Sequence, residues 1–290
     1  GLYTSLYSVN GNPAIAYHNS AGDDIFYIRA NDANGAGWPN PELIDSEATV
    51  GIGISLSVAN LGGDLLTKDN RGTETTADDE VTVSGTPANS GTPVIAYGDA
   101  TNSRIRYVVA NNVNGTGNVG VGLGASMTNW STPEEIPGTG NVGSHFTLRV
   151  VDGIPAIAYQ TSDSKDLKYI RALNPAGMTH NLRDSTQLIL RIFVTALDFR
   201  PDTSWDTPVT LDTAGDVGSY PSLALLNGRP TTSLDRPAIS YYDATNGDLK
   251  FVTAADFTGA VWNAPTTLVS VDDVGRANTL LVTEDLPAVA

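Results

Sequence analysis

The sequence predicts an all-β fold built from repeats, and three observations carry this prediction. Apolar runs about as long as a strand are separated by turns rich in Gly, Asn and Asp. None of these runs shows the 3.6-residue period of a helix. The same succession of segments recurs about every 50 residues, a spacing within the range of propeller blades. We therefore expect a β-propeller of four-stranded antiparallel blades rather than a parallel solenoid or a sandwich.

Each repeat contains four expected strands, which we name A to D in chain order. Strand A follows a Val-Gly pair, at Val50, Val142, Val217 and Val274. Strand B contains a run of Pro, two apolar residues, Ala or Ser, and Tyr. The run ends at Tyr17, Tyr97, Tyr159 and Tyr241. Strand C alternates apolar and polar residues from Ile25, Ile105, Leu167 and Leu249. Strand D follows a Trp and a Pro, the Trp residues being Trp38, Trp130, Trp205 and Trp262.

The repeats predict one propeller domain over residues 1–290. Its blades are expected at about 1–45, 46–137, 138–212 and 213–271, with a partial fifth blade at 272–290. An open ring would expose unpaired strand edges. We therefore expect the chain to continue beyond Ala290, as a fragment of a larger propeller. The alternative is a ring of about five blades, completed by another segment or another chain.

Composition and charge exclude several classes of partner. The chain has 32 Asp and Glu against 16 Lys and Arg, which gives a net charge of −16 that repels nucleic acid and anionic lipid. No apolar run reaches the roughly 18 residues of a membrane span. The longest, Leu188 to Phe199, is interrupted by Arg191 and Asp198. There is no Cys, which excludes disulfides and thiolate metal sites.

A turn signature follows strand C in every repeat. It reads Ala-x-Asp/Asn-x-x-Gly and is followed by the Trp, most clearly at Asp32, Gly35 and Trp38 and again at Asp256, Gly259 and Trp262. Asn112 and Asn174 replace the Asp in the two middle repeats. This pattern resembles the Asp-box of sialidase-like propellers, and the resemblance implies a structural turn. In such a turn the Asx side chain accepts backbone N–H groups, Gly supplies a positive φ and Trp packs between blades.

The resemblance does not extend to catalysis. A sialidase-like enzyme would need a cluster of Arg for the substrate carboxylate, together with a Tyr nucleophile and an acid. The B–C and D–A loops, which share one end of the expected blades, offer only Arg104 and Arg276. We therefore predict no catalytic residue, and the sequence favours a protein that is not an enzyme.

Those B–C and D–A loops form an acidic, hydroxyl-rich rim and are the candidate ligand site. The candidate residues are His18, Asp24, Asp99, His145, Asp163, Asp216, Tyr242, Asp243 and Asp248. Tyr and His rings stack on sugars while Asp accepts from hydroxyls, although the same rings could serve ordinary packing between blades. Asp243 to Asp248 weakly resembles a Ca²⁺ loop but lacks the later bidentate Glu. A plain turn is favoured, and no metal site or cofactor is expected.

The long insertions all fall in the A–B and C–D connections, at the opposite end of the blades. The largest cover residues 61–90, 118–128 and 178–203. Repeat proteins often elaborate one face for a partner, so this insertion face is expected to contact neighbouring proteins. The alternative is that this face merely tolerates insertions.

Three functional hypotheses remain, and the third is a fragment of a surface-layer or appendage subunit, whose insertions would be ordered by neighbouring copies. The first is a non-enzymatic extracellular or cell-surface module, an adhesion, lectin-like or structural unit with carbohydrate as the expected ligand. The second is a glycan-active hydrolase or lyase of sialidase-like fold. A buried carboxylate pair on the B–C and D–A face would favour the second, and a shallow rim would favour the first.

Overall fold

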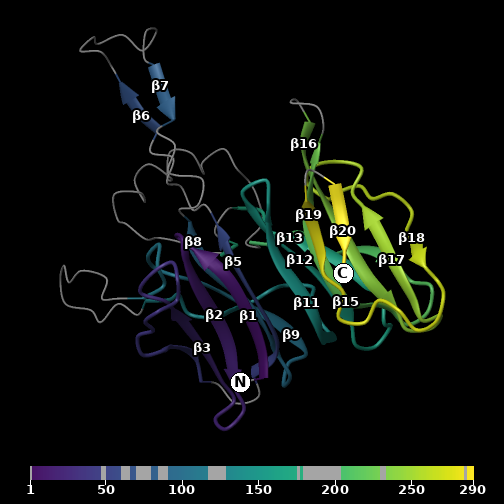
Figure 1. Cartoon of the computed structure of the whole chain (residues 1–290), viewed down its shortest axis with the longest axis horizontal. Coiled ribbons are helices and arrows are strands. Elements are labelled where there is room, and N and C mark those ends of the chain that lie inside the picture. The colour runs from purple at the N-terminus through teal and green to yellow at the C-terminus, as the bar shows by residue number, and fades with distance from the viewer. Residues whose placement is uncertain are drawn as a thin grey trace.

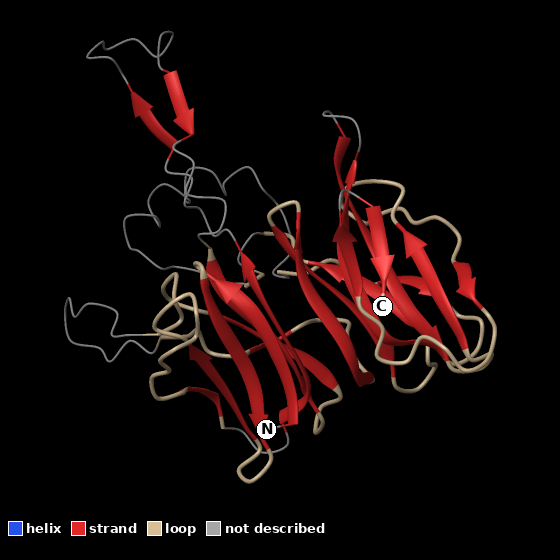
Figure 2. Cartoon of the chain, in the orientation of Figure 1, coloured by secondary structure: helices blue, strands red, loops and turns tan. Residues whose placement is uncertain are grey.

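The computed structural model describes residues 2–46, 50–59, 66–69, 80–83, 91–116, 129–174, 177–178, 204–228, 233–283 and 286–290. In these ranges the chain forms strands and turns and no helix (Figure 2). The predicted all-β class is therefore confirmed. The same ranges contain no helix long and apolar enough to cross a bilayer.

The strands form four antiparallel sheets of four strands, each following the chain order. The first sheet holds β1 (Leu2–Val9), β2 (Asn12–Asn19), β3 (Asp24–Arg29) and β4 (Glu42–Asp45). The second holds β5 (Val50–Ala59), β8 (Thr92–Asp99), β9 (Arg104–Val109) and β10 (Glu134–Glu135). The third holds β11 (Val142–Val151), β12 (Ile154–Thr161), β13 (Leu167–Arg171) and β14 (Val209–Asp212). The fourth holds β15 (Val217–Gly228), β16 (Ser233–Asp243), β17 (Asp248–Thr253) and β18 (Thr266–Val269).

Two hairpins complete the described strands. One pairs β6 (Leu66–Asp69) with β7 (Glu80–Val83), and the other pairs β19 (Leu280–Thr283) with β20 (Leu286–Val289). The four strands expected in each repeat, with their antiparallel order, are thus confirmed for four repeats. The extents of the blades, ring closure and continuation of the chain stay predictions.

Consecutive sheets pack face to face. In Figure 1 the first sheet stands at the left, the teal third sheet in the middle and the green fourth sheet at the right. Among the described residues, one buried apolar cluster lies between each pair of neighbouring sheets. Strand β8 is buried along its whole length because both faces of its sheet are covered, whereas β2 alternates buried and half-buried residues.

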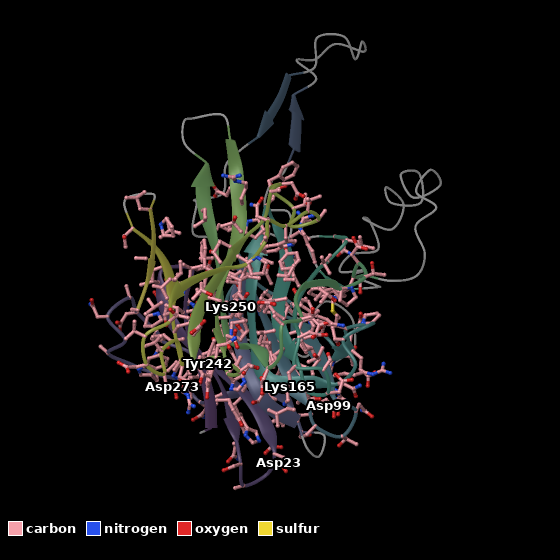
Figure 3. The ribbon with its side chains drawn as sticks, turned by 90° about the vertical axis from the view of Figure 1, so that its right-hand side faces the viewer. Asp23, Asp99, Lys165, Tyr242, Lys250 and Asp273 are labelled. Carbon is pink, nitrogen blue, oxygen red and sulfur yellow. The ribbon has the colours of Figure 1, made fainter. Side chains whose placement is uncertain are left out.

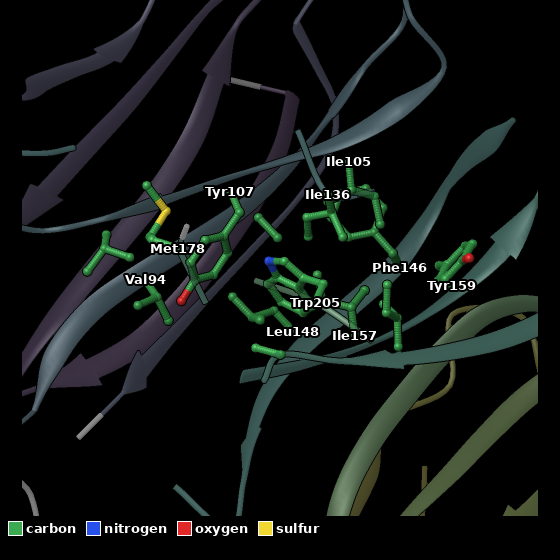
Figure 4. Packing of buried hydrophobic residues seen from close by; sticks show 14 of the residues in the cluster. Val94, Ile105, Tyr107, Ile136, Phe146, Leu148, Ile157, Tyr159, Met178 and Trp205 are labelled. Atoms are coloured by element: carbon green, nitrogen blue, oxygen red, sulfur yellow. The ribbon is translucent and has the colours of Figure 1, made fainter. Parts of the chain in front are cut away.

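An aromatic pair recurs at each of these three boundaries. The Trp rings of the later sheets pack edge-on against a Tyr of the preceding sheet, with ring centroids 5.0–5.3 Å apart. The pairs are Tyr27 with Trp130, Tyr107 with Trp205, and Tyr169 with Trp262. Figure 4 shows Trp205 in the middle of its cluster, near Tyr107, Leu148 and Ile157.

The turn signature fixes the orientation of the Trp side chain that follows it. The carboxylate of Asp256 accepts the backbone N–H groups of residues 258 to 261, and Gly259 takes a φ of 77°. The Trp262 indole then donates to the Gly259 carbonyl. Asp32, Gly35 and Trp38 make the corresponding bonds in the first sheet.

Hydroxyl groups link the first strands of neighbouring repeats. Ser5 Oγ accepts from the Leu56 N–H, and Ser55 Oγ accepts from the Leu148 N–H, each at 2.9 Å. Ser222 Oγ accepts from the Leu280 N–H at the same distance. Strand β19 therefore stands against β15 as β5 stands against β1. Strand β11 also contacts β15, so the first strands of the four sheets and β19 lie side by side.

Most residues of the insertions, where a protein partner is predicted, lie outside the described ranges. Residues 118–128 lie outside the described ranges, as do residues 179–203 with His180 and the apolar run 188–199. Within residues 61–90 the structure describes only the backbone of β6 and β7. A protein partner at the insertion face stays a prediction.

Candidate ligand-binding site

The first strand of each repeat is irregular where it begins. Its pairing with the second strand shifts register there in all four sheets. Three residues after the Val of the Val-Gly pair, the backbone is left-handed: φ is 85° at Gly53, 51° at Tyr220 and 53° at Ala277. Tyr3 holds the same place in the first repeat with a φ of 49°. A large side chain in this conformation is strained, and such strain is typical of functional sites.

These left-handed positions meet in one pocket with a volume of about 240 Å³. It is lined from five repeats, by Tyr3, Gly53, His145, Tyr220, Ala277 and their chain neighbours. His145 occupies the equivalent place in the third repeat. The pocket therefore lies at the end of the sheets that carries the B–C and D–A loops.

An aromatic row runs from the pocket to its rim. The His145 and Tyr220 rings lie 4.1 Å apart, and the Tyr242 ring lies 6.5 Å beyond Tyr220. Tyr242 donates its hydroxyl to Asp273 at 2.6 Å, and Figure 3 shows these two residues side by side. The Arg276 guanidinium covers the Tyr242 ring at 5.3 Å and pairs with Asp273 at 2.9 Å.

Buried and half-buried polar groups hold this row in place. The Asn278 amide donates to the Tyr220 carbonyl at 3.0 Å and to the Gly275 carbonyl at 2.8 Å, which fixes the strained turn. Ser240 donates to the other end of the same amide. Behind His145, Gln160 donates to Asp216 at 2.9 Å. Asn278 and Gln160 are thus committed to positioning the rings.

The histidine of the row is uncharged at neutral pH. Burial lowers the pKa of His145 below its ordinary value of 6.5, and this outweighs the hydrogen bond with Gln160, which acts in the opposite direction. A neutral imidazole carries one donor and one acceptor. Since one ring nitrogen bonds to Gln160, the other can form one hydrogen bond with a hydroxyl group.

Comparison with protein-family models and with curated proteins found no match for this chain. The resemblance to the Asp-box of sialidase-like propellers therefore stays a prediction from the residues.

Two buried ionic clusters lie at the same end of the sheets. Arg106 lies 3.0 Å from Asp45 and 2.9 Å from Asp99. Lys250 lies 2.5 Å from Asp212 and 3.8 Å from Asp243. In each cluster one cation stands between a carboxylate of its own sheet and one of the preceding sheet.

Asp99 and Asp212, one carboxylate of each cluster, are ionised. Burial disfavours the charged form of Asp99, but hydrogen bonds from Asn102 and the charge of Arg106 outweigh it and lower the pKa below 3.8. For Asp212, burial is likewise outweighed by the hydrogen bond from Lys250, and the pKa is lowered. Neither Asp99 nor Asp212 can donate a proton at neutral pH, so neither can act as the acid of a hydrolase.

Some of the candidate residues predicted from the sequence lie at the pocket, and others belong to the ionic clusters. His145 lines the pocket, and Tyr242 extends its aromatic row. Asp99 and Asp243 belong to the ionic clusters and also hold their B–C turns by accepting backbone N–H groups. Asp216 supports Gln160 behind His145.

The remaining candidates lie beside the pocket or on the rim. His18 is buried, with Nε2 3.2 Å from Asp23 and its ring 6.5 Å from that of Tyr3. Asp163 is exposed and accepts from Asn141 at 2.8 Å. Asp24 and Asp248 begin the C strands β3 and β17. A role in ligand binding stays a prediction for each of them.

Sequence reasoning did not include Tyr3 or Asn278. A signal existed, because aligning the repeats at Val-Gly places Tyr3, Gly53, His145, Tyr220 and Ala277 in one column. These residues meet in a pocket because the first strands are irregular where they begin, and the alignment does not reveal this irregularity. Among the described residues, no group of three or more His, Asp or Glu could hold a metal ion.

Proposed function

We propose that this chain is part of a β-propeller that binds carbohydrate without catalysis, at the pocket where the first strands begin. The observation that carries the proposal is the pair Tyr3 and Tyr220. Both are large residues held at a positive φ, and both line the same pocket from different repeats. Strain of this kind costs stability, so a functional reason for it is the natural inference.

The propeller architecture is supported by the way the sheets repeat. Each has its four strands in chain order, and each packs face to face on the next. The first strands lie side by side through the links from Ser5, Ser55 and Ser222. In a propeller, first strands converge on the central axis, and a pocket lined from every repeat belongs there.

Carbohydrate suits the chemistry of the pocket. The Tyr3 and Tyr220 side chains keep exposed fractions of 45% and 36%, so their rings are open to a ligand. The hydroxyls of Thr4 and Ser144, which also line the pocket, make no hydrogen bond to another described residue. Aromatic faces beside unpartnered hydroxyls match the C–H faces and hydroxyl groups of a sugar.

The proposal includes an extracellular or surface location and a role in adhesion. A net charge of −16 and a chain without Cys are compatible with such a module. The hydrolase alternative is not favoured, because the buried carboxylates Asp99 and Asp212 are ionised and paired with cations. The described pocket lining contains no carboxylate of its own.

A glycan array probed with the purified chain tests this function. We expect binding to a subset of glycans, and calorimetry on the best one should show about tenfold weaker binding for Tyr220→Ala. Phe257→Ala is the matched control, because Phe257 is similarly exposed at 38% but lies in a C–D loop at the other end of the sheets. Absence of binding to every glycan, or equal losses in both variants, would reject the proposal.

A further inference from the structure

We infer that the pocket selects a neutral sugar ring over acidic sugars and over cationic ligands. This inference rests on the proposed function, since it names the class of ligand for the same site. It follows from the charges around the pocket, the hydrogen-bonding groups that line it, and its size.

The charges argue against an anionic ligand. No Lys, Arg, Asp or Glu is among the described residues that line the pocket. On the rim, Arg276 is paired with Asp273 at 2.9 Å and stacked on Tyr242, and Lys165 acts on His145 from outside the lining by lowering its pKa. An acidic sugar would therefore bring a carboxylate to a described lining that contains no cation, in a chain of net charge −16.

A cationic ligand is the competing class, because tyrosine faces attract cations and the net charge is negative. The lining nevertheless lacks a carboxylate to neutralise such a ligand. It offers instead the hydroxyls of Thr4 and Ser144 and the neutral imidazole of His145. These groups donate and accept hydrogen bonds, which is what a polyhydroxylated neutral ligand requires.

The size and the rings indicate one sugar unit. The pocket volume of about 240 Å³ is below the roughly 300–1,000 Å³ of pockets for drug-sized ligands. The Tyr220 ring is held from behind by His145 at 4.1 Å, and its backbone is fixed by Asn278 at 3.0 Å. A single pyranose stacked on Tyr220 fits this arrangement, with the rest of a glycan outside the pocket.

Paired ligands that differ only in charge test the inference. Calorimetric titrations at 0.15 M salt would use the methyl glycosides of glucose, galactose and mannose, the methyl glycosides of glucuronic and galacturonic acid, and choline. We expect a neutral glycoside to bind about tenfold or more tightly than its uronic counterpart, and choline to bind more weakly than that glycoside.

A variant that adds charge sharpens the test. Ala277 is exposed and lines the pocket, so Ala277→Lys places a cation there. We expect it to shift the preference toward the uronic acid by roughly twofold to fivefold, as an exposed ion pair does. Thr267→Lys, on the exposed strand β18, adds the same charge elsewhere and should leave the preference unchanged.

The possible outcomes distinguish failure of the inference about charge from failure of the proposed sugar binding. Uronic glycosides that bind as tightly as the neutral ones, or an unchanged preference in Ala277→Lys, would overturn the inference and leave sugar binding standing. Choline as the tightest ligand would overturn both the inference and the proposed function. Binding by none of these probes, together with a blank glycan array, would reject the proposed function itself.

Discussion

Tyr97 donates its hydroxyl to Asp45 across the boundary between the first and second sheets, with the two oxygens 2.6 Å apart. Tyr241 makes the same bond to Asp212 between the third and fourth sheets. Pro137, two residues after β10, stands at the corresponding place, so the boundary between the second and third sheets lacks the carboxylate there. The bonded residues are 52 and 29 positions apart in the sequence, so the two bonds connect successive repeats.

Removing the Tyr97 hydroxyl should weaken this boundary. We expect Tyr97→Phe to lower the free energy of unfolding by about 1.5–3 kcal/mol, because a buried bond to a charged group is lost. Urea denaturation measures this change. Tyr17→Phe is the control, because Tyr17 is the equivalent residue of the first sheet and its hydroxyl bonds to no other described residue. Equal effects of the two substitutions would show that the bond to Asp45 contributes nothing.

Removing the cation of an ionic cluster should be more damaging. Lys250→Met leaves Asp212 and Asp243 buried without their cation, and we expect a loss of about 3–5 kcal/mol. Lys168→Met changes the equivalent residue of the third sheet, which is only half-buried, and should cost about 1 kcal/mol or less. Thermal and urea unfolding of both variants would check this, and a Lys250 variant as stable as the Lys168 variant would contradict it.

The ionic clusters also predict how stability depends on pH. The folded-state pKa values of Asp99 and Asp212 are below the ordinary value of 3.8. The unfolded chain therefore takes up protons first as the pH falls, and the stabilisation present above pH 3.8 is lost below it. Urea midpoints measured between pH 6 and pH 3 should decrease toward the acid end, and Asp212→Asn should reduce that decrease. A midpoint independent of pH would disprove this account.

Gly259 and Gly35 form a matched pair for the turn signature. Both take a positive φ, 77° and 69°, so Ala at either position pays the same backbone strain of about 1–2 kcal/mol. A Cβ at Gly259 would lie 2.6 Å from the Tyr169 ring, whereas at Gly35 the nearest atom is 3.5 Å away. We expect Gly259→Ala to be the more destabilising by about 1–3 kcal/mol in urea unfolding, because it overpacks the boundary between sheets. Equal losses would mean that the boundary adjusts freely.

Ser55 and Ser57 test the links between first strands. Ser55→Ala leaves the buried Leu148 N–H without its acceptor and should cost about 1–3 kcal/mol. Ser57 is also buried, but its hydroxyl bonds to no other described residue, so Ser57→Ala should be neutral or stabilising. Chemical denaturation of the two variants compares them directly. The hydroxyl link would be irrelevant if Ser57→Ala were the more harmful change.

Local patterns made most of the fold predictable. The apolar alternation of Ile25 to Arg29 and the turn chemistry of Asp32 and Gly35 act over a few residues, so they can be recognised without the structure. The candidate site was less predictable. Asp99 and Asp243 looked like rim ligands, and only the positions of Arg106 and Lys250 reveal them as parts of ionic clusters.

The sequence by itself determined the all-β class, the four strands of each repeat and their order, because strand periods and turn residues are local properties. Only the tertiary structure decided that Tyr3, His145 and Tyr220 line one pocket, and that Asp45 accepts from Tyr97. These contacts join repeats far apart in the chain. They depend on how the sheets stack and on bulges that turn the backbone left-handed, and neither is encoded in any single repeat.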